Sequence, residues 1–125
     1  METQTTMLPT TLIVLRHSPH DERWLAEGLD VALVGAVFGQ EVKLLFMGQG
    51  VMSLIPGQHD TLGKPLSTSA ILESLAMYGI KELLVPSNEL AKLNIGQNDM
   101  MAGVSVIDDD QLRACFSKAS HVLTF

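Results

Sequence analysis

The stretch Glu41-Val-Lys-Leu-Leu-Phe-Met-Gly-Gln-Gly-Val-Met-Ser-Leu-Ile-Pro-Gly-Gln58 decides the fold of this chain. It begins with an apolar run from Val42 to Met47, which ends abruptly at Gly48-Gln49-Gly50. A short apolar run that is closed by glycine is typical of a buried strand, and glycine allows a sharp turn. Functional groups in open α/β sheets gather at such strand-to-helix corners. We therefore predict that this corner faces a partner or a shared site.

The segments around this stretch predict strands that alternate with helices. Apolar strands are expected at 11–15, 42–47, 83–85, 104–107 and 121–125. Helices are expected at 21–38, at 51–55, before Gly79, at 89–93 and after Asp108, where Gln111 completes a capping-box pattern. Ser18 and Asp21 are expected to help cap the helix at 21–38, and Ser87 is expected to cap the helix at 89–93. This alternation predicts a single α/β domain over residues 11–125, with about five mostly parallel strands and helices on both faces of the sheet. Residues 1–10 are expected to form a flexible lead-in.

The second half of the first predicted helix is apolar on every side. Residues 31–38 contain no polar side chain, so one sheet cannot cover all of this surface. Another subunit is the simplest second cover. We therefore expect Val34, Val37 and Phe38 to lie at an interface.

Composition excludes several classes of protein. The 125 residues are 46% hydrophobic and only 18% charged, which argues against disorder and indicates surplus apolar surface. A net charge of −6 opposes direct binding of nucleic acid. A single cysteine excludes an internal disulfide framework. The start of the chain resembles no signal peptide, and no apolar run is long enough to span a membrane, so a cytoplasmic location is expected.

Four candidate sites have a more ordinary explanation. Cys115 falls on the apolar face of the last predicted helix, where a free cysteine behaves as a small apolar residue. His17, His20 and Asp21 lack a distant ligand that would complete a metal site, and His17 in Arg-His-Ser is only a weak match to the Arg-His-Gly motif of histidine phosphatases. Gly48-Gln49-Gly50 lacks the third glycine of a dinucleotide loop. We expect no catalytic residue, no cofactor and no metal.

Several short motifs then resemble the DsrE/DsrF-like sulfur-relay family, and in particular its TusC (DsrF) branch. The most specific motif is Gly-Val-x-x-Leu-Ile-Pro-Gly-Gln at residues 50–58. Gly28-Leu29-Asp30, Tyr78-Gly79-Ile80, the segment 87–95 and the terminal Val122-Leu-Thr-Phe125 follow the family in order and spacing. The resemblance covers nearly all of the chain from Thr11.

This resemblance implies a flavodoxin-like fold and a place in a TusB–TusC–TusD complex, a dimer of heterotrimers. That complex accepts persulfide sulfur from TusA and passes it to TusE for 2-thiolation of the tRNA wobble uridine, whereas the DsrE–DsrF–DsrH counterpart serves sulfur oxidation. The relay cysteine of the family belongs to the TusD branch, at the end of the third strand. The matching positions here are about Val85, Pro86 and Ser87, none of which is cysteine.

The chain is therefore expected to be a non-catalytic subunit that packs against TusB-like and TusD-like sister subunits. Two alternatives remain, a free-standing homo-oligomeric binding module and, remotely, a phosphatase-like enzyme that uses His17. The residues expected at the partner interface are Val34, Val37, Phe38, Gly48, Gln49, Gly50, Val51, Leu54, Ile55, Pro56, Gly57, Gln58, Ser87 and Asn88.

Overall fold

The computed structural model describes residues 9–59, 62–64 and 68–125 of the chain. Most of the predicted flexible lead-in, residues 1–10, lies outside these ranges. The strands are β1 (Thr10–Leu15), β2 (Glu41–Phe46), β3 (Glu82–Pro86), β4 (Val104–Ile107) and β5 (His121–Thr124). The α-helices are α1 (Glu22–Val37), α2 (Thr68–Leu75), α3 (Ser87–Leu93) and α4 (Asp109–Lys118). Three 3₁₀-helices complete the order: η1 (Gly48–Leu54), η2 (Ala76–Tyr78) and η3 (Gln97–Asp99).

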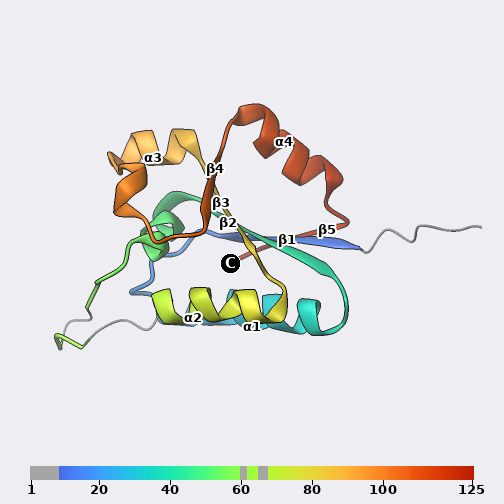
Figure 1. Ribbon diagram of the computed structural model, residues 1–125, viewed down its shortest axis with the longest axis horizontal. Helices are drawn as coiled ribbons and strands as arrows, with labels where there is room; N and C mark the ends of the chain where they lie inside the picture. Colours follow the sequence, from blue (N-terminus) through green and yellow to red (C-terminus); the bar gives the residue numbers. More distant parts are fainter. Residues whose placement is uncertain (1–8, 60–61, 65–67) are drawn as a thin grey trace, which may run out of the picture.

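All five strands form one parallel sheet in the order β4-β3-β2-β1-β5. Helices α1 and α2 lie on one side of this sheet, and α3 and α4 lie on the other (Figure 1). The predicted α/β class, with five parallel strands between helices, is therefore confirmed. Among the residues that the structure describes, no helix is long and apolar enough to cross a bilayer.

The strand β1 lies inside the sheet and is buried on both faces. Ile13 and Leu15 belong to the large core under α1 and α2, whereas Leu12 and Val14 belong to a smaller core under α4. None of these four side chains exposes more than 3% of its surface. This two-sided burial explains why the segment reads as a continuous apolar run instead of an alternating one.

The two cores differ in how completely helices cover them. Helix α1 contributes Leu25, Leu29 and Ala32 to the large core, all of them buried. Helix α4 has no fully buried residue, and every residue of the edge strand β5 is exposed. The α4 side of the sheet and its β5 edge are thus the less covered parts of the fold.

Local signals set most of the element ends. Asp108 and Gln111 form the expected capping box of α4, with Gln111 N–H donating to Asp108 Oδ1 at 2.8 Å and Asp108 N–H donating to Gln111 Oε1 at 2.9 Å. Gly79 ends η2 in the left-handed region, at φ 85°. The expected caps of α1 and α3 were wrong. Asp21 makes no side-chain capping bond, and Ser87 is the first residue of α3 and not its cap.

Candidate functional site

The glycine corner joins the carboxyl end of β2 to η1, beside the end of β1. A side chain at Gly50 would place its Cβ 1.9 Å from the carbonyl oxygen of Leu15, closer than any real contact. The same carbonyl accepts a hydrogen bond from Met47 N–H at 3.1 Å. Gly50 is therefore required for packing within the chain. Gly48 and Gln49 are exposed, whereas Gly50 is buried, so only the first two can offer their surface to a partner.

The corner is also held from the side by α3. The carboxylate of Glu89 accepts a hydrogen bond from the backbone N–H of Gly48, and Lys92 Nζ lies 3.3 Å from Glu89 Oε2. Glu89 exposes only 12% of its side chain. The pairing is not visible in the sequence, because 41 residues separate Gly48 from Glu89.

The loop after η1 is held by its own hydrogen bonds. The side-chain amide of Gln58 donates to the carbonyls of Met52 at 2.6 Å and Ile55 at 2.7 Å, and Leu54 accepts a bond from Met101 N–H at 2.8 Å. Val51 and Leu54 have no exposed surface. Of the residues expected at the interface in this stretch, Pro56 and Gly57 are therefore exposed, and Ile55 and Gln58 are partly exposed.

The end of β3 lies at the same edge of the sheet and carries Ser87 and Asn88. Both residues are exposed, and Asn88 Nδ2 donates to Asp109 Oδ1 of α4 at 2.9 Å. No thiol is present at this position. Cys115 lies on α4, half-buried against the smaller core. It lines a hollow together with Lys43 and Glu82, which lie near the amino ends of β2 and β3. The predicted place of Cys115 on the apolar face of its helix is confirmed.

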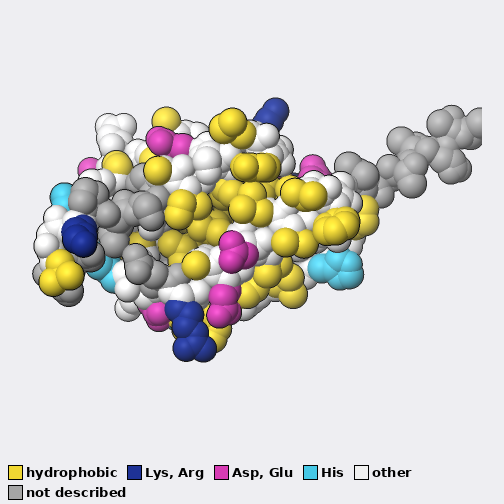
Figure 2. Space-filling view, turned by 90° about the horizontal axis from the view of Figure 1, so that it is seen from below, with side chains coloured by type: hydrophobic (Ala, Val, Ile, Leu, Met, Phe, Trp, Pro, Cys, Tyr) yellow, Lys and Arg dark blue, Asp and Glu magenta, His cyan; other side chains and the backbone are white. Residues whose placement is uncertain are grey.

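The three apolar residues expected at an interface lie at the end of α1, near the edge of the sheet opposite to this corner. Val34, Val37 and Phe38 stand at the end of α1, toward the start of β2, with 57%, 70% and 80% of their surfaces exposed. Ile71, Met77 and Tyr78 add further exposed apolar surface on α2 and η2. Figure 2 shows hydrophobic side chains over much of this side of the molecule. The expected interface residues thus form two separate surfaces, the α1 end and the carboxyl edge of the sheet.

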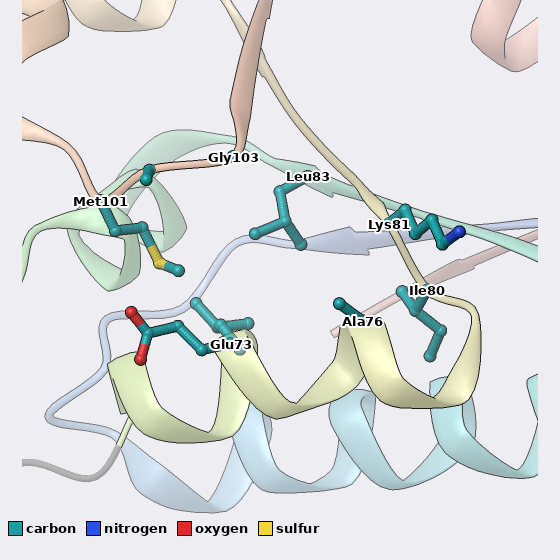
Figure 3. A pocket seen from close by; sticks show the side chains of 9 residues that line it. Glu73, Ala76, Ile80, Lys81, Leu83, Met101 and Gly103 are labelled. Carbon is teal, nitrogen blue, oxygen red and sulfur yellow. The ribbon is translucent and has the colours of Figure 1, made fainter.

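A groove of about 300 Å³ lies between α2 and the start of β4. Its wall is mostly apolar, with Ile80, Leu83 and Met101 facing the space, and the charged ends of Glu73 and Lys81 lie apart (Figure 3). Because Ile80 and Lys81 precede β3 and Met101 precedes β4, the groove lies at the amino edge of the sheet. Glu73 and Lys81 are the charged side chains of this lining, and the rest of its side chains are apolar.

The histidines of the loop after β1 do not converge on a metal. The His17 ring stacks on Trp24, with ring centroids 4.9 Å apart, and His20 Nε2 lies 3.1 Å from the carbonyl oxygen of His59. Within residues 9–59, 62–64 and 68–125, no three His, Cys, Asp or Glu side chains come close enough to hold an ion. The stacking of His17 on Trp24 was not predicted from the sequence, because a spacing of seven residues across a loop gives no periodic signal.

The fold and its carboxyl edge define the class of the protein. It is a parallel α/β protein with a tight glycine corner and no thiol after the third strand. A sequence profile of the DsrE/DsrF-like family matches residues 10–125, and the chain belongs to that family.

Individual relatives agree with this assignment. A protein named TusC homolog from Pseudomonas aeruginosa is 32% identical over 118 residues, which cover 94% of this chain and 99% of the relative. The intracellular sulfur oxidation protein DsrF of Allochromatium vinosum is 32% identical over 87 residues, covering 69% of this chain and 63% of DsrF. The crystal structure of the ychN protein from E. coli superposes with a TM-score of 0.77 at 19% identity, covering 95% of this chain and all of that one, and so supports the fold.

Proposed function

We propose that the chain is a TusC-like subunit of a sulfur-relay complex and that it does not carry the sulfur itself. Its sister subunits would be TusB-like and TusD-like chains. The complex would accept persulfide sulfur from a TusA-like donor and pass it to a TusE-like acceptor, for 2-thiolation of the tRNA wobble uridine in the cytoplasm. The full-length similarity to a TusC homolog supports this assignment.

The proposal that this chain does not carry the sulfur rests on the residues at the end of β3. A persulfide needs a cysteine sulfur, and Val85, Pro86 and Ser87 supply none. Cys115 packs against the smaller core near the other edge of the sheet. A relay site of the family's kind would therefore have to come from a sister subunit.

The two exposed surfaces suggest how those subunits are held. Phe38 and its neighbours on α1 would contribute apolar area, which is costly to leave in water. The rigid corner at Gly48 and the exposed Ser87 and Asn88 would offer polar backbone and side-chain groups at the carboxyl edge. An apolar patch and a polar edge at opposite ends of one subunit suit contacts with two different neighbours.

The test is co-expression of a tagged form of this chain with TusB-like and TusD-like chains, followed by affinity purification. We expect all three chains to be recovered in fixed ratio. Phe38→Ser should weaken recovery of one partner, whereas Phe116→Ser, which changes a 40%-exposed phenylalanine on α4, is the matched control. Recovery of this chain alone, as a homo-oligomer or as a monomer, would refute the proposal and favour a free-standing binding module.

A second candidate role is that of a DsrF-like subunit in sulfur oxidation. The 32% identity to DsrF of Allochromatium vinosum favours it, although that match covers less of both chains. Deletion of the gene distinguishes the two roles. Loss of 2-thiouridine from tRNA supports the first, and loss of growth on reduced sulfur with intact tRNA supports the second. Family membership gives the phosphatase hypothesis for His17 no support.

A further inference from the structure

The edge strand β5 is the least covered strand of the sheet. It pairs with β1 alone, so no strand lies beside its outer edge among the residues that the structure describes. All four of its residues are exposed, and none belongs to either core. At the opposite edge of the sheet, Val104, Val106 and Ile107 of β4 all pack against a core. An added strand would therefore cover more exposed surface at β5 than at β4.

The backbone groups of β5 point alternately toward β1 and away from it. Phe125, directly after the strand, bonds to β1 through both its N–H and its carbonyl, at 2.9 and 2.8 Å. Because alternate residues of a strand bond to the same neighbour, Leu123 faces β1 in the same way. The N–H and C=O groups of Val122 and Thr124 therefore point to the open edge.

The side chains of β5 leave this edge unprotected. Leu123 is aligned with Ile13 and lies on the α1 side of the sheet, and Val122 is aligned with Leu12 and lies on the α4 side. Both keep about two fifths of their surface exposed, 40% and 42%. Edge strands are commonly protected by a charged side chain or a proline, and residues 121–124 contain neither. Such an edge is a template for another strand.

The strand that fits this edge by symmetry is β5 itself. When a second copy is turned by 180° about an axis through Leu123, the two strands run antiparallel. Val122 then lies opposite Thr124 of the second copy, and each such pair exchanges two backbone hydrogen bonds. Leu123 meets its own copy at the axis, and His121 lies opposite Phe125. No Lys, Arg, Asp or Glu takes part in these pairs, so no like charges meet.

We propose that the open edge of β5 binds a second copy of this chain, in the antiparallel register centred on Leu123. The sheet then continues from one copy into the other. The contact uses neither Phe38 nor the corner at Gly48, so it is compatible with a complex that holds two copies of each chain. Because each paired strand has only four residues, the interface is small, and we expect a dissociation constant on the order of micromolar.

Disulfide formation tests the register in the full-length chain. Two variants are made in the Cys115→Ala background, which removes the single native thiol. Leu123→Cys sets two thiols directly opposite, at a Cα separation of about 4.5 Å that a disulfide can span. The control Val122→Cys changes a residue of matched exposure, whose two copies would lie on a diagonal about 7–8 Å apart, at or beyond the reach of a disulfide.

The oxidant is glutathione disulfide, and covalent dimers are counted by non-reducing electrophoresis. We expect Leu123→Cys to form dimers about tenfold faster than Val122→Cys, or more, because only its thiols meet in the proposed register. Equal rates in the two variants would overturn the proposal.

Hydrogen exchange of the wild-type chain gives a second readout that needs no new thiol. The amide protons of Val122 and Thr124 should exchange several-fold more slowly at millimolar than at micromolar protein concentration, because pairing protects them. Leu123→Lys sets like charges at the axis and should remove this dependence. Exchange at Val122 and Thr124 that is independent of concentration in the wild type would also overturn the proposal. Neither readout requires sister subunits, so a failure here is distinguishable from a failure of the sulfur-relay assignment.

Discussion

The closeness of Gly50 to β1 predicts that Gly50→Ala destabilises the protein. The new Cβ would lie 1.9 Å from the carbonyl oxygen of Leu15, and ordinary contact begins near 3.4 Å, so the two segments must separate by about 1.5 Å. The obstacle is backbone and cannot rotate away. Because Gly50 is not among the glycines with positive φ, the cost is purely steric.

The size of the effect follows from the contacts that this shift disturbs. Overpacking a close contact costs about 1–3 kcal/mol, and weakening the bond from Met47 N–H to the carbonyl of Leu15 adds about 1 kcal/mol. We therefore expect a loss of about 2–4 kcal/mol, a large part of the stability of a typical domain. Urea unfolding followed by Trp24 fluorescence and circular dichroism measures it.

The matched control is Gly96→Ala. Gly96 has an ordinary extended backbone, at φ −83°, and its new Cβ would meet only the end of the Asp99 side chain, at 3.1 Å. This variant should stay within about 0.5 kcal/mol of the wild type. If Gly50→Ala were equally mild, the proposed role of the corner in joining β2 to the end of β1 would be refuted.

Three further substitutions test other parts of the structure. Asp108→Ala removes the cap of α4 and should lower the free energy of unfolding by about 1 kcal/mol, measured in urea; no change would show that the capping box is dispensable. Glu89→Ala removes the acceptor of the Gly48 N–H and should cost about 1 kcal/mol and speed hydrogen exchange at Gly48; unchanged exchange would contradict the contact. Cys115→Ala should leave sulfur transfer by the assembled complex unchanged, and lost transfer by a folded, assembled variant would assign the thiol a role.

Local patterns in the sequence predicted the elements that depend on neighbouring residues. Continuous apolar runs indicated β1 and β2 because those strands are buried on both faces. The pair Asp108 and Gln111 predicted the start of α4 because a capping box spans only four residues. The same kind of signal gave a wrong prediction at Ser87. The extended residue before α3 is Pro86, so Ser87 is already inside the helix and does not cap it.

Features that join distant segments were not predictable in this way. Gly50 was expected to present backbone to a partner, but its nearest neighbour is the end of β1, 35 residues earlier in the chain. Arg16, Trp24 and Phe125 line one hollow, which needs the loop after β1, the first turn of α1 and the end of β5 together. Its position follows only from the strand order, which residue spacing does not reveal. Likewise, the apolar count indicated surplus apolar surface, but not that the expected interface residues lie on two separate surfaces.

The most direct test of the central claim is mass spectrometry of the assembled complex after sulfur loading. The three co-expressed chains are purified together, loaded by a persulfide-carrying TusA-like donor, and each chain is weighed under non-reducing conditions. The account predicts that a sister subunit gains the mass of sulfur and that this chain keeps its unmodified mass. A persulfide on Cys115 of this chain, formed as fast as transfer to the acceptor, would contradict it.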